Sequence, residues 1–132
     1  MLDKVNELRK SEGVAPLRLN ENLSKAANIR AYEAFTEFSH YRPDGSYFID
    51  VFADYNIPYH FKNAGENIAF GPEHITHTDT ALAAYSMWRS SHGHYLNMIN
   101  PDFEEIGIGY YNDIKTNDIN YVYSTQIFGT QY

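Results

Sequence analysis

The sequence predicts an α+β fold, a three-layer α-β-α sandwich in which helices flank a small, mainly antiparallel sheet. Helical periodicity dominates residues 2–38, alternation with a period of two dominates after Pro101, and a short strand-like segment at 65–70 lies between them. Each amphipathic helix or half-buried strand needs another layer to cover its apolar side, so this order of elements favours packed layers. A length of 132 residues without internal repeats predicts a single domain over 1–132.

Two amphipathic helices open the chain. In residues 2–12 apolar side chains recur every third position, and Gly13 ends the pattern. Asn20 is a suitable N-cap for a second helix that reaches about residue 38. Its apolar stripe consists of Leu23, Ala26, Ala27, Ala31, Ala34, Phe35 and Phe38. Because most of the stripe is alanine, we expect this helix to pack closely against a neighbour.

The next segment has the composition of a turn followed by a short helix. Residues 39–45, S-H-Y-R-P-D-G, favour a tight reversal. His40 stands at its head, where the negative end of the preceding helix favours a protonated imidazole; the residue either ends the helix or belongs to a site. Ser46 is a suitable cap for a helix to residue 55, with four residues on its buried side: Phe48, Val51, Phe52 and Tyr55.

Residues 65–70 predict a short strand that ends at Gly71. Strand alternation puts Glu66 on the same face as Ile68 and Phe70. A carboxylate among apolar groups is costly to bury alone. We therefore expect Glu66 to have a partner.

The polar segment 72–80 predicts a loop in which His74 and His77 are exposed rather than metal ligands, because no apolar scaffold fixes them. Thr78 or Thr80 is expected to cap the following helix. The apolar stripe of that helix is Leu82, Tyr85 and Trp88.

The stretch W-R-S-S-H-G-H-Y-L-N-M-I-N at 88–100 holds the only tryptophan and two of the six histidines, among small residues and amides. Gly93 is predicted to break the helix after Ser91, and His94 to begin a new turn with Asn97 on its side. This composition is typical of a concave polar site.

Two alternating segments, 106–110 and 121–128, predict an antiparallel hairpin whose loop includes residues 115–118. Gln126 is a polar residue in an otherwise apolar strand. It is either a core amide tied to backbone or part of a site.

Composition excludes several classes of protein. A net charge of −7 and a pI near 5.2 argue against nucleic acid and anionic membranes as partners. The absence of cysteine excludes disulfides and thiolate metal sites, and fits both the cytosol and a Gram-positive-like exterior. No apolar run is long enough to span a membrane, and the helical pattern directly after Met1 is not that of a signal peptide. We expect a domain excised from a longer protein.

Several motifs, in order along nearly the whole chain, resemble those of one family. They are V-N-E-L-R-K-S-E-G-V-A-P-L, L-N-E-N-L-S-K-A-A, S-H-Y-R-P-D-G, G-E-N-I-A, W-R-S-S-H-G-H-Y-L-N-M-I-N-P, I-G-I-G-Y and Y-S-T-Q-I-F-G. The chain is similar to the CAP superfamily, which comprises cysteine-rich secretory proteins, antigen five and plant pathogenesis-related proteins, in its cysteine-free bacterial branch of SCP-like domains. The resemblance implies an α-β-α sandwich, an extracellular or cell-wall location, and a cleft where two histidines and acidic residues meet.

Carried over by motif, the resemblance assigns the cleft residues His40, Glu66 and His94. Ser91 stands where many eukaryotic relatives have a second glutamate, which weakens the expectation of an acid-pair mechanism. His92 is interpreted as incidental. His40 and His94 are the candidate ligands of a divalent metal such as zinc, with Glu66 as a ligand or beside the ligands. The alternative is a carboxylate held by a histidine and backbone amides, without metal.

Three functions remain open. The first is a non-catalytic module that binds a protein, glycan or lipid through the cleft and its tyrosine-rich rim. The second is a metal-dependent, protease-like hydrolase in which Glu66 is the base. The third, lipid or sterol binding, rests on the resemblance alone. Serine chemistry through Ser90 or Ser91 has little support, because no G-x-S-x-G elbow precedes them.

Overall fold

A computed structural model describes residues 1–114 and 119–132 and contains one four-stranded sheet with the strand order β1-β3-β4-β2. The strands are β1 (Arg18–Leu19), β2 (Phe61–Pro72), β3 (Glu105–Asp113) and β4 (Tyr121–Gln131). β4 pairs antiparallel with both β2 and β3, and only the two-residue β1 pairs parallel, with β3. The predicted mainly antiparallel sheet and its hairpin are confirmed; the hairpin loop at 115–118 lies outside the described residues.

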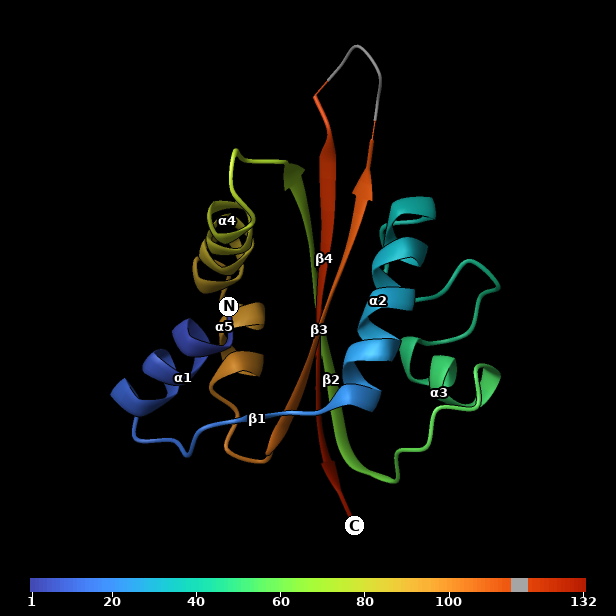
Figure 1. The fold of residues 1–132 in the computed structure, drawn as a ribbon. Helices are drawn as coiled ribbons and strands as arrows, with labels where there is room; N and C mark the ends of the chain where they lie inside the picture. Colours follow the sequence, from blue (N-terminus) through green and yellow to red (C-terminus); the bar gives the residue numbers. More distant parts are fainter. Residues whose placement is uncertain (115–118) are drawn as a thin grey trace.

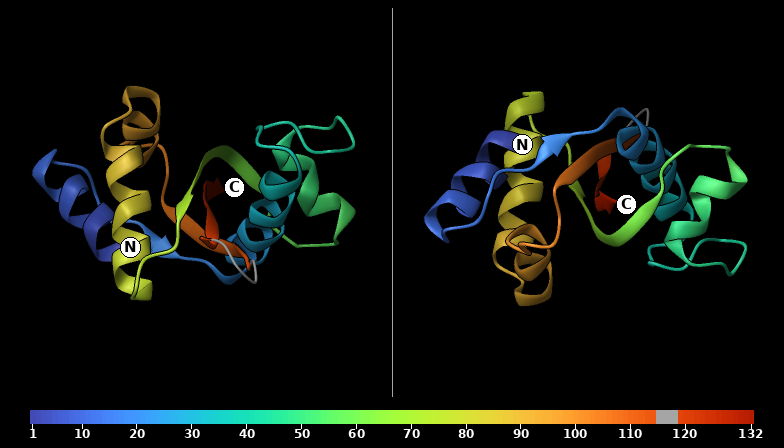
Figure 2. Two further views of the ribbon diagram at one scale, coloured as in Figure 1. Left: turned by 90° about the horizontal axis from the view of Figure 1, so that it is seen from above. Right: turned by 90° about the horizontal axis from the view of Figure 1, so that it is seen from below.

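Helices cover both faces of this sheet (Figures 1 and 2). One face carries α1 (Leu2–Ser11), α4 (His77–Arg89) and α5 (His92–Met98). The other carries α2 (Glu21–Thr36), the 3-10 turn η1 (Phe48–Asp50) and α3 (Val51–Asp54). The buried side chains form two clusters, one under each helical layer. The structure therefore confirms the three-layer α-β-α sandwich.

The alanine stripe of α2 does pack closely, against β3. A Cβ atom added to Gly107 would lie 2.0 Å from the Leu23 carbonyl carbon, and one added to Gly109 would lie 2.2 Å from that of Ala27. Asn20 caps the helix as predicted, since its Oδ1 accepts from the Leu23 N–H at 3.1 Å. The helix ends at Thr36 rather than 38, which leaves Phe38 beyond the helix and 48% exposed.

Two predicted helix boundaries are wrong. The predicted helix over 46–55 is only η1 and the single turn of α3; Ser46 does not cap it, because the Ser46 hydroxyl bonds to Asp44 within the preceding turn, and Tyr55 is exposed. α4 begins at His77, inside the predicted loop, because the Thr76 hydroxyl accepts from the Asp79 N–H at 3.0 Å. His74 and His77 are exposed, as predicted.

β2 is longer than the predicted 65–70 and forms an edge of the sheet.

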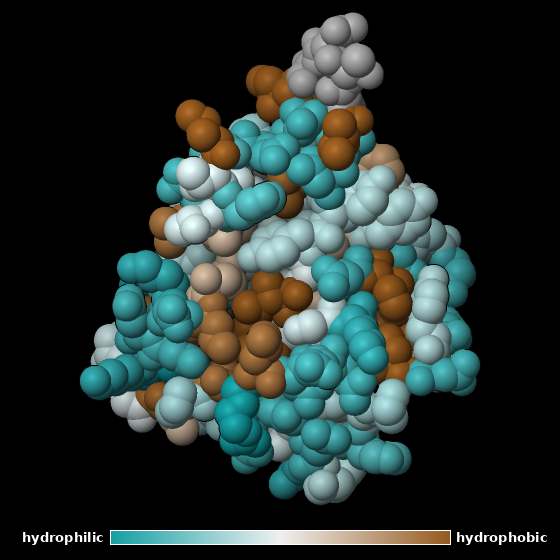
Figure 3. Space-filling view, viewed as in Figure 1, coloured by the Kyte–Doolittle hydropathy of each residue, from teal (hydrophilic) through white to brown (hydrophobic). Residues whose placement is uncertain are grey.

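In the described part of the chain, no helix has the length and apolar character needed to cross a bilayer. On the face shown in Figure 3, hydrophobic surface collects in the middle of the molecule between hydrophilic flanks.

Candidate functional site

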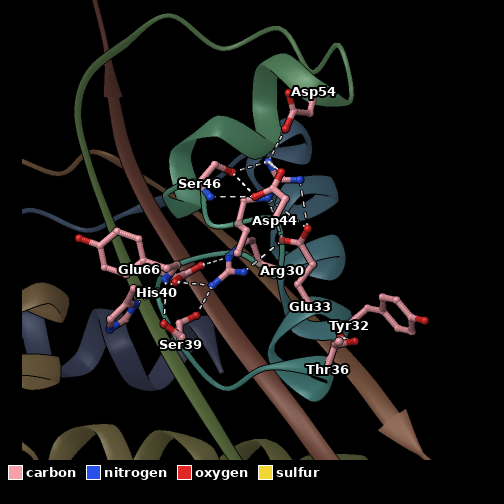
Figure 4. Close-up of polar contacts among 12 residues, drawn as sticks. Arg30, Tyr32, Glu33, Thr36, Ser39, His40, Asp44, Ser46, Asp54 and Glu66 are labelled. Atoms are coloured by element: carbon pink, nitrogen blue, oxygen red, sulfur yellow. Dashed lines mark hydrogen bonds and ion pairs between the residues drawn. The ribbon is translucent and has the colours of Figure 1, made fainter.

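The centre of the site is the carboxylate of Glu66, which β2 directs into the interior. Its side chain has an exposed fraction of 0%. Arg30, from the buried stripe of α2, donates from Nε to Oε2 at 2.7 Å and from Nη2 to Oε1 at 3.0 Å (Figure 4). The expected partner of Glu66 is thus a fully buried arginine in a two-point ion pair.

The same arginine connects α2 to the turn that carries His40. Its Nη2 also donates to the Ser39 carbonyl at 2.7 Å, and its Nη1 donates to Glu33 Oε1 at 3.1 Å. Glu33 in turn accepts from Arg42, whose guanidinium also bonds to Asp54. A chain of charged groups therefore fixes the backbone on both sides of His40.

Arg30 was missed at the sequence level, although a signal for it exists. Arg30 follows Ala27 by three positions and precedes Ala34 by four, so it belongs to the buried stripe. A buried guanidinium requires acceptors, and a buried carboxylate elsewhere in the chain is the natural one.

His40 is the exposed member of the site. Its Nδ1 lies 2.8 Å from Glu66 Oε1, and 42% of its side chain is exposed. Because an ionised carboxylate only accepts hydrogen bonds, Nδ1 carries the proton. In the neutral ring, Nε2 is then free to accept a proton, a hydrogen bond or a metal ion.

His94 lies on α5, and amide side chains fix its backbone against β2. Asn67 Nδ2 donates to the His94 carbonyl at 3.0 Å, and Asn97 donates to Asn67 Oδ1 at 2.9 Å and to the Glu66 carbonyl at 3.3 Å. Asn67 also donates to Gln126 Oε1 at 3.0 Å, so Gln126 is a core amide tied to a side chain rather than to backbone.

The His94 ring is an unsatisfied group. Its Nδ1 is buried and has no hydrogen-bond partner among the described residues. Burial lowers the pKa of His94, and the nearby charge of His40 lowers it further. Both effects favour the neutral ring, which retains a lone pair on one nitrogen for a ligand.

The predicted helix break at Gly93 is wrong. α4 ends at Arg89, Ser91 occupies the position before α5, and Gly93 is the second residue of α5. The break comes two residues earlier because Ser90 closes α4 by bonding from its hydroxyl to the Ser86 carbonyl at 2.8 Å, while the Ser91 backbone is extended. His94 nevertheless shares its helix with Asn97, as predicted.

Two hollows meet at His40. The first, called the cleft below, has a volume of about 380 Å³, with apolar walls from Phe38, Ile68, Ala69, Phe70, Met87 and Trp88 and polar groups from Ser39, His40, Ser91 and His94. The second has a volume of about 430 Å³ and includes Tyr47, Glu66 and Asn97. The structure thus brings His40, Ser91 and His94 to one cleft, and Glu66 bonds to His40 from the second hollow. Exposed His92 is not among the residues that line the cleft.

The donor set fits a metal only in part. In residues 1–114 and 119–132 no group of three or more His, Asp or Glu side chains is arranged to hold an ion. Both Glu66 oxygens already accept hydrogen bonds, so the available protein ligands are the two imidazoles. A carboxylate bonded to the far nitrogen of a metal-binding histidine is a common second layer around metal sites, and the His40–Glu66 contact has this form.

Comparison with known proteins shows the relationships of the chain. The CAP family, described as the cysteine-rich secretory protein family, matches residues 2–128. The uncharacterized protein YkwD of Bacillus subtilis is 33% identical over 112 residues, which is 83% of this chain and 40% of YkwD.

Solved structures show the same fold. An extracellular protein of Bacillus anthracis that contains a SCP domain has a TM-score of 0.74 and 26% identity over 98% of this chain and 39% of its own. An outer surface protein of Borrelia burgdorferi has a TM-score of 0.72 and 22% identity over 99% of this chain and 90% of its own. The chain therefore spans about two fifths of the length of YkwD and of the Bacillus anthracis protein. It belongs to the CAP family of cysteine-rich secretory proteins, with bacterial relatives and no cysteine of its own.

Proposed function

We propose that this CAP domain is a non-catalytic binding module of a secreted or cell-surface protein, and that its ligand occupies the cleft beside His40 and His94. The observation that carries the proposal is the state of Glu66. Arg30 donates to both of its oxygens, His40 donates to Oε1, and its side chain has no exposed area. A general base needs a free lone pair within reach of the attacking water.

The cleft has the character of a binding site. Its walls are mainly apolar and include a few polar groups, which is the usual composition of a ligand pocket. Phe38 and Phe70, at 48% and 45% exposed, present aromatic surface at its rim. Such surface favours a ligand that buries apolar groups and bonds to an imidazole.

The proposed location outside the cell is supported by the relatives. The Bacillus anthracis protein is described as extracellular, and the Borrelia burgdorferi protein as an outer surface protein.

The binding assay uses a tryptophan to fill the cleft. Ser91 lines the cleft and its side chain caps no helix, whereas Ser90 is exposed and outside the cleft. Mixtures of peptides, cell-wall glycan fragments and lipids are screened by chemical-shift changes in labelled wild type, Ser91→Trp and Ser90→Trp. A cleft ligand binds wild type and Ser90→Trp and is lost in Ser91→Trp. If no compound shows this difference, the proposal is wrong.

We also propose that His40 and His94 can hold a divalent ion such as zinc, with Glu66 orienting His40. In residues 1–114 and 119–132, one nitrogen of each ring has no hydrogen-bond partner, which supports this. Zinc titration calorimetry of wild type and of the His40→Ala/His94→Ala double variant is the test, with the exposed pair His74→Ala/His77→Ala as the matched control. Equal zinc binding in the two double variants contradicts the ion site.

The alternative function, a metal-dependent hydrolase, predicts a different result with Glu66→Gln. If the wild type with zinc cleaves a cleft ligand, and Glu66→Gln abolishes cleavage but keeps zinc, the non-catalytic proposal fails.

A further inference from the structure

The outer edge of β2 is only partly occupied. The Glu73 N–H donates to the Asn120 carbonyl at 2.8 Å, in register with the pairing of Glu66 and Ile127. In an antiparallel ladder this bond fixes which residues face the partner strand. The odd-numbered residues of β2 from 65 to 71 therefore bond to β4, and the backbone groups of Glu66, Ile68 and Phe70 point away from the sheet.

Side chains occupy the first part of this edge. Asn97 donates to the Glu66 carbonyl at 3.3 Å, and Trp88 Nε1 donates to the Ile68 carbonyl at 3.1 Å. These contacts confirm that the carbonyls of even-numbered residues face outward. They also stop any added strand from continuing past Ile68 toward Glu66.

The next part of the edge lacks hydrogen-bond partners, and its side chains range from buried Ile68 to half-exposed Phe70. Within the described residues, no hydrogen bond reaches the N–H groups of Ile68 and Phe70 or the Phe70 carbonyl from outside the sheet. Pro72 has no N–H and ends the row of donors. Unpaired backbone groups on an edge strand are a template for another extended chain.

The residues that carry these groups also line the cleft. Ile68, Ala69 and Phe70 line it from β2, Met87 lines it from α4, and Phe38 lines it from the segment after α2. The Phe38 and Phe70 rings meet edge to face at 5.0 Å between centroids. The residues that carry the unpaired backbone groups therefore line a hollow with apolar walls.

We propose that the cleft binds an extended polypeptide segment, which adds as a short strand to the edge of β2 at Ile68 and Phe70. The inference rests on the proposed binding function and specifies its ligand class. The peptide backbone accepts from the Ile68 and Phe70 N–H groups and donates to the Phe70 carbonyl. Its side chains alternate between the apolar walls and solvent. Backbone pairing supplies affinity, and His40 and His94 lie where they contact a polar side chain or chain end.

The test uses the peptide backbone as the probe. A displayed library of linear heptapeptides is selected against the intact chain, and the best binder is synthesised with one N-methyl group at each backbone nitrogen in turn. In a paired strand, alternate nitrogens face the sheet edge. We expect a period of two: methylation at inward nitrogens weakens binding about tenfold or more, and methylation at outward nitrogens has little effect. Fluorescence anisotropy measures the affinities.

Two protein-side measurements locate the strand. Hydrogen exchange at the Phe70 and Ile68 amides should slow when the peptide binds. Phe70→Ala keeps the backbone donor and should keep the period of two, whereas Ser91→Trp should lose binding.

Three results would overturn the inference. They are a loss of affinity on N-methylation that does not alternate along the peptide, an unchanged rate of hydrogen exchange at the Phe70 amide in the bound state, and the absence of any peptide binder. Its failure is distinct from failure of the proposed function. If a glycan or lipid binds wild type and Ser90→Trp but not Ser91→Trp, the proposed binding function stands and the peptide inference is excluded.

Discussion

At the scale of single residues, the ion pair of Arg30 and Glu66 decides the character of the site. Both side chains have exposed fractions of 0%. Breaking a buried pair leaves an uncompensated charge, which typically costs about 3–5 kcal/mol. We expect Arg30→Met to lower the free energy of unfolding by about this amount, measured by urea denaturation.

The control is an exposed pair in the same protein. Arg18 and Glu104 lie 3.9 Å apart with side chains 68% and 59% exposed, so Arg18→Met should cost less than about 1 kcal/mol. The double variant Arg30→Met/Glu66→Gln should recover part of the loss, because it removes both buried charges. If Arg30→Met is no more destabilising than Arg18→Met, the structural role given to the pair is wrong.

The sequence predicted which residues to examine but not how they meet. His40 and Glu66 are 66 − 40 = 26 positions apart, and Glu66 and His94 are 94 − 66 = 28 apart. No local pattern links residues at such separations. Only the motif resemblance indicated that these three residues belong to one site. The periodicity of α2 also indicates that Arg30 is buried. The pairing of Arg30 with Glu66, however, depends on the path of β2 across the sheet.

At the scale of elements, the closest approach is that of α2 to β3. The alanines of α2 and the glycines of I-G-I-G-Y leave no room for another atom. We expect Gly107→Ala to lower the free energy of unfolding by at least about 2 kcal/mol, because the new methyl group would overlap the backbone at Leu23.

Gly93 provides the matched control for this change. It lies inside α5, and an added Cβ would have nothing within 4 Å. Alanine has the higher helix propensity, so Gly93→Ala should be neutral or stabilise by up to about 1 kcal/mol. Thermal unfolding of the two variants compares the positions directly; similar losses at both would contradict the close contact.

Glu105 joins three elements and makes their stability depend on pH. It accepts from Asn20 at the start of α2, from the Tyr59 hydroxyl and from Gln131 at the end of β4. Burial alone would raise the pKa of Glu105, but these hydrogen bonds outweigh it and the pKa lies below the usual value. The carboxylate therefore stabilises the fold above its unfolded pKa, and the contribution is lost as the pH falls through the folded pKa.

The matched variants are Glu105→Gln and, at the exposed neighbouring position, Glu104→Gln. Wild type and Glu104→Gln should lose stability more steeply than Glu105→Gln between about pH 5 and about pH 3. Urea midpoints across this range measure the slope, and parallel slopes in wild type and Glu105→Gln would exclude the linkage.

Helix ends were the least predictable part of the fold. By residue type, any of three threonines could cap α4: Thr76, Thr78 or Thr80. The backbone conformation determines that Thr76 is the cap. Gly93 is permissive in many backbone conformations, so its presence could not show that the helix was already interrupted at Ser91. The strand pattern was more reliable, because alternation between core and solvent is required wherever one face is buried.

At the scale of the whole molecule, Arg9 connects α1 to the chain between α5 and β3. It is 1% exposed and has no carboxylate partner among the described residues. Its guanidinium instead donates to four backbone carbonyls, those of Ala15, Met98, Asn100 and Phe103, at 2.6–3.1 Å. Burial lowers the pKa of Arg9, yet the group remains charged at any ordinary pH.

This arrangement predicts that Arg9→Lys is not a conservative change. An ammonium has three donors at one point and cannot reach carbonyls spread around a planar fork, so at least one carbonyl loses its partner. We expect a loss of about 2–3 kcal/mol in the free energy of unfolding, while changing the exposed neighbour with Lys10→Met should cost less than about 0.5 kcal/mol. Hydrogen exchange separates a local from a global effect. Faster exchange in both α1 and α5 would show that Arg9 joins the N-terminal helix to the layer that carries His94, whereas faster exchange in α1 alone would contradict that role.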